Sequence, residues 1–373
     1  MPTISFFPWI TITEPLSVGD FQLVPCSSVL ADPSIPQQTC GAISEILQTF
    51  GHKRKVDRDS IPFLRHRSAE FLSEIDDVRI GRYFSFRLNV AFAILSARRY
   101  FDHRYANSDD TKLVVQRFAE DRLGATSLVS RRRDGTATSI VAHDSLLVRR
   151  PDHVSGWCEI PRDLDLDLLV ALERLGSGSS RLGPLVCDAV RLFVGANTDS
   201  PDVGLHSELV DVVSAFSRLA EDWTEDQTAR EFHRTVPSPT TDVLLPQGTS
   251  SRSGRASART AESAKRKQSV RELWLRDAYR LRGDVSHGQV TNPPYPSLWT
   301  LHEHLLLASV ALPLYVKRLL HLEGAYSWSE RDEEWTEAFD ALALTEPFVD
   351  NGQSWNEVIR QVLILRLARI LPE

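Results

Sequence analysis

The sequence has few of the features that mark secreted and disulfide-stabilised proteins. Only four of its 373 residues are cysteines, and no two of them form a C-x-x-C pair: Cys26, Cys40, Cys158 and Cys187. Scattered cysteines in a chain of this length predict free thiols in a reducing compartment rather than a disulfide framework. The N-terminal segment has no basic region ahead of its apolar residues, so no signal peptide is expected.

Long apolar runs and an excess of basic charge are also missing. The longest apolar run, Leu305 to Val316, is shorter than the roughly 20 residues that span a bilayer, and it contains Pro313. We therefore expect a cytoplasmic protein that makes no membrane contact. The net charge of -7 excludes nucleic-acid binding by bulk electrostatics, so any such binding must use local basic patches.

The composition and length are those of an ordinary globular protein with more than one domain. Hydrophobic residues make up 42% of the chain, which is enough for a substantial core. The periodicity predicts an α+β fold, in which a mixed α/β N-terminal domain (1–160) precedes an all-α helical bundle (161–325) and a helical C-terminal tail (326–373). A sensory or regulatory role is expected for the N-terminal domain.

In the N-terminal domain, local patterns predict a small sheet with helices packed on it. Aromatic and β-branched residues on either side of Gly19-Asp20 predict a hairpin between 6–13 and 21–24. A second hairpin is expected around Asp134-Gly135. Helices are predicted over 42–50 and over 84–101, the second with an apolar face formed by Phe84, Leu88, Phe92 and Leu95.

From residue 161 the apolar spacing is helical. Leucines between 164 and 175 form one stripe, and further helices are expected over 184–196 and 209–223. Ser269 and Glu272 form a capping box that begins a helix ending near Gly288. Ser297 is expected to cap a long apolar helix that ends near Leu320.

A segment without apolar periodicity, 237–268, interrupts the bundle and is predicted to be a flexible insertion. Between Thr249 and Gln268 it holds six basic residues and one Glu, a net charge of +5. Its position directly before the next helix makes it a candidate RNA-guiding arm. The residues expected to bind RNA there are Arg259, Lys265, Arg266 and Lys267.

One short motif points to chemistry. Arg282 and His287 are separated by four residues at the predicted end of a bundle helix, and Gly288 follows. This arrangement resembles the R-x4-6-H motif of HEPN domains, in particular the Apea-like HEPN group. About ten residues match closely, and the helical architecture is similar over roughly 162–322. A second Arg-x4-His pair, at Arg98 and His103, lies in the mixed N-terminal region and lacks this context.

The resemblance implies a metal-independent endoribonuclease that acts as a homodimer with both motifs facing one cleft. A histidine can transfer a proton near neutral pH, and an arginine can hold the charge that develops on a phosphate. Arg282 and His287 are therefore the candidate catalytic residues. Asp284 is expected to orient one of them, while Tyr279 and Arg280 are expected to line the cleft, Tyr279 by stacking on a base.

The family further implies a bacterial toxin or anti-phage effector that cleaves RNA, with a trigger sensed by the N-terminal domain. Two positions depart from the family pattern: Gly283 follows the arginine, and Ser217 stands where an acidic residue is frequent. A catalytically inactive HEPN dimer that binds a nucleotide or a partner therefore remains an alternative, as does a chance match on an ordinary bundle.

No cofactor or metal site is predicted. His302 and His304 are two residues apart, so on a helix their side chains point to different faces, whereas metal-binding pairs favour a spacing of four.

Overall fold

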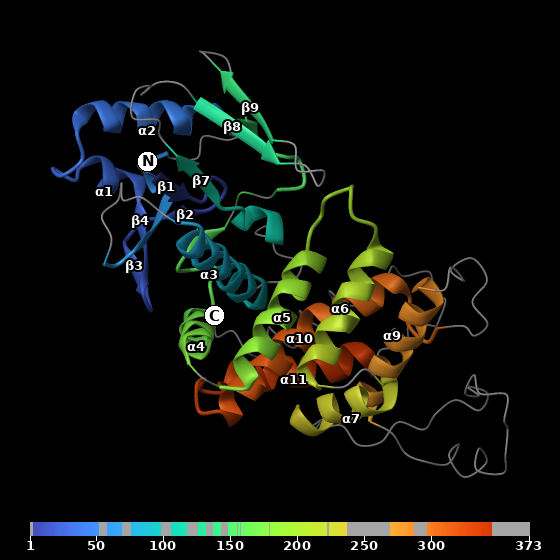
Figure 1. Ribbon diagram of the computed structural model, residues 1–373. Helices are drawn as coiled ribbons and strands as arrows, with labels where there is room; N and C mark the ends of the chain where they lie inside the picture. The colour runs from blue at the N-terminus through green and yellow to red at the C-terminus, as the bar shows by residue number, and fades with distance from the viewer. Residues whose placement is uncertain are drawn as a thin grey trace, which may run out of the picture. The chain divides into compact units, whose positions relative to one another are not determined.

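The computed structural model describes residues 3–51, 58–68, 76–97, 106–117, 126–131, 137–142, 148–154, 156, 158–178, 180–221, 224–236, 269–286 and 297–344. Its helices and strands form an α+β protein, as predicted. The chain divides into two compact units, Met1–Glu173 and Arg174–Glu373 (Figure 1). The predicted boundary at residue 160 lies earlier than this division, because Leu164 and Leu169 join the core of the first unit rather than the bundle.

The first unit is built on a five-stranded antiparallel sheet with the order β3-β4-β6-β1-β7. Its strands are listed here in chain order: β1 (Thr3–Phe6), β3 (Leu16–Val18), β4 (Phe21–Pro25), β6 (Pro62–His66) and β7 (Val114–Arg117). Side chains alternate between the two faces, so neighbouring residues of one strand enter different cores. Leu23 and Val24 of β4 are one such pair.

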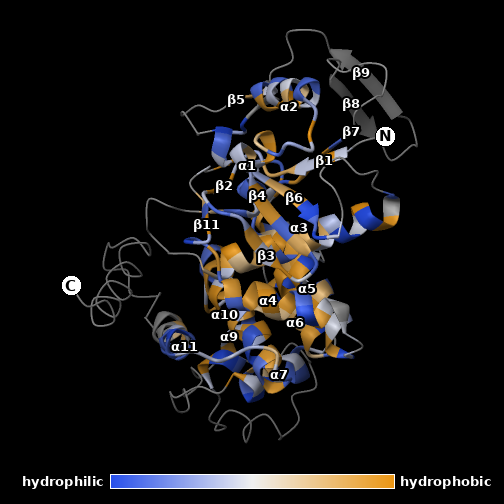
Figure 2. Cartoon of the chain, turned by 90° about the vertical axis from the view of Figure 1, so that its left-hand side faces the viewer, coloured by the Kyte–Doolittle hydropathy of each residue, from blue (hydrophilic) through white to orange (hydrophobic). Residues whose placement is uncertain are grey.

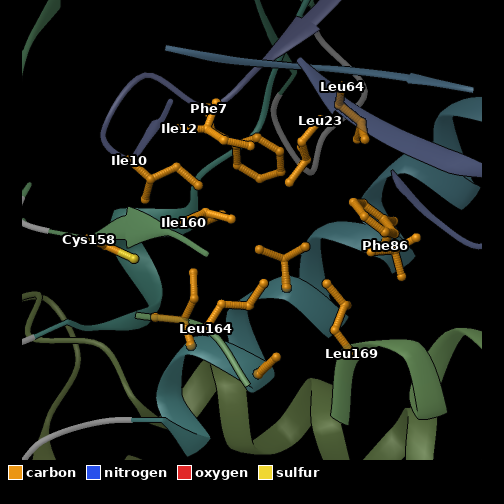
Figure 3. Packing of buried hydrophobic residues seen from close by; sticks show 14 of the residues in the cluster. Phe7, Ile10, Ile12, Leu23, Leu64, Phe86, Cys158, Ile160, Leu164 and Leu169 are labelled. Carbon is orange, nitrogen blue, oxygen red and sulfur yellow. The ribbon is translucent and has the colours of Figure 1, made fainter. Parts of the chain in front are cut away.

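Both faces of this sheet are covered. On one face α3 (Asp77–Ser96) and the start of α4 (Leu166–Ser177) contribute to the core drawn in Figure 3, which includes Phe86 and Leu169. The other face packs on α1 (Cys26–Leu30) and α2 (Gln37–Thr49). The first unit therefore has two hydrophobic cores, one on each face of the sheet.

The remaining short elements of the first unit lie outside the main sheet. β2 (Thr11–Ile12) pairs with β11 (Glu159–Ile160), and β5 (Phe50–Gly51) pairs with β10 (Val148–Arg149). Two 3-10 turns are η1 (Arg58–Ser60) and η2 (Ser108–Thr111). The predicted second hairpin is confirmed as β8 (Thr126–Arg131) paired with β9 (Ala137–Ala142).

Two predictions for this unit need correction. The turn at Gly19-Asp20 joins β3 to β4, whereas β1 pairs with the distant β6 and β7, so 6–13 is not the first arm of the hairpin. Phe84 is 44% exposed, because the buried face of α3 runs through Tyr83, Phe86 and Val90 instead. Arg98 and His103 lie outside the described residues.

The regular secondary structure described in the second unit is all helical. Its helices are α5 (Leu182–Ala196), α6 (Leu205–Leu219), α7 (Glu225–Thr235), α9 (Val270–Ser286), α10 (Leu301–Leu322) and α11 (Glu330–Leu344). Five of these helices each contribute one aromatic ring to a shared core: Phe216, Phe232, Trp274, Tyr315 and Phe339. Ring centroids in this cluster lie 5.3 to 6.3 Å apart, the usual range for stacked and edge-on pairs.

The helix α11 is part of this bundle and not of a separate tail, since Phe339 joins the aromatic core. The helix α7 was not predicted, because its sequence is mostly hydrophilic. Its apolar residues are Ala229 and Phe232, and both are buried in the core. The expected helix at the C-terminus beyond residue 344 lies outside the described residues.

The helix α10 is the central helix of the unit. Figure 2 shows it as largely hydrophobic, in contrast to the more hydrophilic α11. By length and composition it could cross a membrane, yet 67% of its most apolar stretch is buried within the protein. That burial is what the core helix of a soluble bundle shows. The residue that caps its N-terminus is Thr300, and not Ser297 as the sequence predicted. Thr300 accepts a hydrogen bond from the Glu303 amide, whereas Ser297 binds Asp277 of α9.

Candidate functional site

Arg282 lies in the last turns of α9, the helix that the Ser269 cap begins. Its guanidinium carbon lies 5.7 Å from the centre of the Tyr279 ring, one turn back on the same helix. Among the residues that the structure describes, Arg282 has no carboxylate within ion-pair distance. This partly exposed cation is therefore available to a ligand. His287 lies outside the described residues, so the position of its imidazole relative to Arg282 stays a prediction.

The two other arginines in this part of α9 are already paired. Arg280 Nε lies 3.2 Å from Glu225 Oε1, and Arg276 Nε lies 3.2 Å from Asp226 Oδ1. Both carboxylates come from the first turn of α7, where a helix favours negative charge. Burial raises the pKa of Glu225, and the nearby Arg280 opposes that rise. The cleft-lining role predicted for Arg280 would therefore require it to exchange this partner.

Tyr279 occupies a different place from the one predicted. The side chain is only 8% exposed, and its hydroxyl donates to Thr228 Oγ1 at 3.1 Å while also contacting the Ser217 hydroxyl. A ring held inside the bundle in this way cannot stack on a base, so that expectation is wrong. Ser217, which stands where an acidic residue was expected, belongs to this cluster. Its hydroxyl is part of a buried hydrogen-bond network that joins α6, α7 and α9.

Asp284 is buried at 6% exposure, although it lies only two residues from Arg282. The two side chains therefore lie on different sides of α9, since residues two apart on a helix do not share a face. This placement does not favour orientation of Arg282 by Asp284. An orienting role toward His287 stays a prediction, and so does RNA binding by Arg259, Lys265, Arg266 and Lys267, which lie outside the described residues.

The residues that precede α10 are fastened to α9 by a cluster that the sequence did not indicate. Asp277 Oδ2 accepts hydrogen bonds from the Ser297 hydroxyl at 2.7 Å and from the Leu298 amide at 2.7 Å. The Trp299 amide lies 3.3 Å from the same oxygen. His304 of α10 completes the cluster, with Nε2 at 3.3 Å from Asp277 Oδ2 and 3.1 Å from Ser297 Oγ.

This cluster also separates the two histidines that were considered as metal ligands. His304 is fully buried, whereas His302 is exposed, so they face different sides of α10, as the spacing predicted. No group of three or more His, Cys, Asp or Glu side chains that could hold a metal ion occurs within the described part of the chain.

The described residues that flank the basic insertion contact each other. Arg271, in the first turn of α9, donates to the carbonyl of Val236, the last described residue before the insertion. The same guanidinium binds Asp340 and the carbonyl of Thr336, both on α11. The described residues on the two sides of the insertion, Val236 and the first turn of α9, are therefore in contact.

No family model, no curated protein and no solved structure matches this chain. The residues at the end of α9 are therefore the basis for a functional proposal.

Proposed function

We propose that this chain is a metal-independent endoribonuclease of HEPN type, which acts in the cytoplasm as a bacterial toxin or anti-phage effector. The observation that carries the proposal is Arg282: a partly exposed guanidinium near the end of a bundle helix, without a counter-ion among the described residues, five positions before His287. Its neighbours Arg276 and Arg280 are both paired with carboxylates, so Arg282 is the cation on this stretch that is open to phosphate.

The proposed reaction uses the 2'-hydroxyl of the RNA as nucleophile. The 2'-oxygen forms a bond to phosphorus, the bond from phosphorus to the 5'-oxygen breaks, and a 2',3'-cyclic phosphate results. One imidazole removes the 2'-hydroxyl proton, and a second donates a proton to the leaving 5'-oxygen. The planar fork of Arg282 holds two phosphate oxygens as negative charge increases in the transition state.

One chain offers a single Arg282–His287 pair, and the reaction needs both an acid and a base. A homodimer that brings two pairs to one cleft supplies both, as the resemblance to HEPN domains implies. The first unit, which has cores of its own, would sense a trigger or restrain the activity in this proposal. Sedimentation analysis tests the dimer directly, since the particle should have twice the mass of one chain.

Expression of the protein in a bacterium tests the proposed function through two readouts, the growth rate and the integrity of total RNA. Wild type should slow growth and degrade total RNA, while Arg282→Ala and His287→Ala should do neither. Arg230→Ala is a suitable control, because Arg230 is an exposed arginine of the same unit whose partner is the exposed Asp226. Equal growth and intact RNA in all four cultures, with soluble folded protein present, would leave the inactive binding module as the better account.

A further inference from the structure

Two ion pairs join the first turn of α7 to α9, and they differ in depth. The Arg276 side chain is 12% exposed where it meets Asp226, whereas the Arg280 side chain is 40% exposed where it meets Glu225. Arg280 lies four residues after Arg276, on the same face of α9 and one turn nearer to its end. A ligand in solution can therefore reach Arg280, while Arg276 is the deeper contact that attaches α7 to α9.

The contact between Arg280 and Glu225 is weak compared with the buried ion pair of the same helix. Its closest approach is 3.2 Å, from Nε to Oε1. Arg271 instead binds Asp340 at two points, at 2.7 and 3.0 Å, and both side chains are buried. A partly exposed pair with one long contact adds little to stability, because water solvates the separated partners almost as well. Arg280 can therefore exchange Glu225 for another anion at little cost.

Glu225 occupies the guanidinium that a phosphate would bind. Within the described part of the chain, it is the one carboxylate at ion-pair distance from Arg280. Burial raises the pKa of Glu225, and Arg280 is the strongest influence that opposes this rise. The negative charge of Glu225 is thus stabilised mainly by Arg280. A phosphodiester can bind the guanidinium fork through two oxygens, which is a stronger contact than the single approach at Nε.

We propose that Arg280 is a second phosphate-binding residue of the RNA site and that Glu225 is its autoinhibitory competitor, which must leave Arg280 before an RNA strand binds there. This inference rests on the proposed function. Arg280 and Arg282 lie two residues apart and on different faces of α9, so they contact different phosphates of the strand. Arg276 keeps its contact with Asp226, so α7 stays attached while the Glu225 side chain moves.

Binding of an RNA that cannot be cleaved tests this exchange. The probe is a fluorescent single-stranded RNA oligonucleotide with 2'-O-methyl groups, and its anisotropy gives the Kd at fixed salt. Glu225→Gln should tighten binding ~3-fold, because a neutral side chain no longer competes for Arg280. Arg280→Gln should weaken binding ~2-fold in the wild-type background and ~6-fold in the Glu225→Gln background, where Arg280 is free to bind phosphate.

The salt dependence provides a second readout of the same exchange. Each phosphate contact with a single strand adds about 0.7 to the slope of log Kd against log salt concentration. The slope should therefore be steeper by about that amount in Glu225→Gln than in Glu225→Gln combined with Arg280→Gln. Equal slopes in these two variants would show that Arg280 does not bind phosphate.

Asp188 and Arg191 of α5 provide the matched control, because they form an exposed ion pair of the same charges within the same unit. Asp188→Asn changes the net charge as Glu225→Gln does, so a general electrostatic effect appears in both. Arg191→Gln should change the Kd by the same factor with and without Asp188→Asn. The proposal is overturned if Glu225→Gln tightens binding no more than Asp188→Asn, or if Arg280→Gln has the same effect in both backgrounds.

The binding measurement is independent of catalysis. If Arg282→Ala and His287→Ala cleave RNA normally, the proposed function fails, but the Kd values still decide whether Glu225 competes for Arg280. Melting temperatures confirm that each variant is folded. If Arg280→Gln does not fold, Arg280→Lys replaces it and should also weaken binding in the Glu225→Gln background, because an ammonium lacks the two-point contact. Absence of RNA binding in both wild type and Glu225→Gln would overturn the inference.

Discussion

Arg271 and Asp340 form a two-pronged ion pair in the interior of the helical unit, with Nε to Oδ1 at 2.7 Å and Nη2 to Oδ2 at 3.0 Å. Each side chain is 1% exposed. The pair joins α9 to α11, and Arg271 also binds the carbonyls of Val236 and Thr336. A single buried guanidinium thus connects the end of α7, the start of α9 and the middle of α11.

Loss of one member of this pair should be costly. Asp340→Ala leaves a buried guanidinium without its carboxylate, so the free energy of unfolding should fall by about 3 to 5 kcal/mol. Denaturant titration of the full chain measures this. The double variant Arg271→Met with Asp340→Leu removes both charges and should be clearly more stable than Asp340→Ala. A loss below about 1 kcal/mol in Asp340→Ala would show that the pair does not stabilise the unit.

The basic insertion should be removable without unfolding the bundle. Because Arg271 binds Val236 O, the described residues that flank the insertion are neighbours, and a short Gly/Ser linker in place of 238–267 can join them. The melting temperature should stay within a few degrees of wild type. Binding of RNA should weaken and depend less steeply on salt, because six basic residues are lost and fewer phosphate counterions are released. Unchanged RNA affinity and salt dependence would exclude the guiding role.

Tyr279 should matter for stability and not for contact with RNA. Tyr279→Phe leaves the buried hydroxyls of Ser217 and Thr228 without this partner, which should cost about 1 kcal/mol of unfolding free energy. Tyr279→Leu also removes the ring, and the KM of its folded molecules for RNA should not change, because the ring is buried. A large rise in KM in Tyr279→Leu but not in Tyr279→Phe would reinstate the stacking role that the sequence suggested.

Deprotonation of Glu208 should make the helical unit less stable as the pH rises. Burial, and to a lesser extent Asp199, raises the pKa of Glu208 from 4.5 to about 7. The folded state therefore binds this proton more tightly than the unfolded state, so the stability contribution is lost as pH rises from about 4.5 to about 7. Glu208→Gln should raise the unfolding free energy at pH 8 by about 2 kcal/mol and change it little near pH 4.5.

Denaturant titrations at these two pH values measure the effect. Asp202→Asn, at an exposed position in the turn before α6, is the control and should show no such pH dependence. An equal effect of Glu208→Gln at both pH values would contradict the raised pKa.

Elements whose pattern is local could be predicted from the sequence. The 3-4 spacing of Leu209, Val212 and Phe216 predicted α6, and the turn at Asp134-Gly135 predicted the pairing of β8 with β9. Ser269 was recognised as the start of α9, and its hydroxyl does accept a hydrogen bond from the Glu272 amide. In each case the determining residues lie within one helix or one hairpin.

Features that depend on distant residues could not be predicted. Ser297 has the side chain of a helix cap, but Asp277, twenty residues away, binds it instead. Phe84 matches an apolar helix face, yet the sheet of the first unit packs on a face rotated away from it. The helix α7 is hydrophilic and is stabilised by contacts from Arg276 and Arg280 of α9, which its own sequence does not show.

The most direct test of the central claim is to analyse the products of RNA incubated with the purified full-length protein in excess EDTA. The account predicts cleavage that leaves 2',3'-cyclic phosphate and 5'-hydroxyl ends, no cleavage where the nucleophilic 2'-hydroxyl is replaced by hydrogen, and a loss of at least ~100-fold in both Arg282→Ala and His287→Ala. Cleavage that requires a divalent metal, or that persists undiminished in both variants, would contradict it.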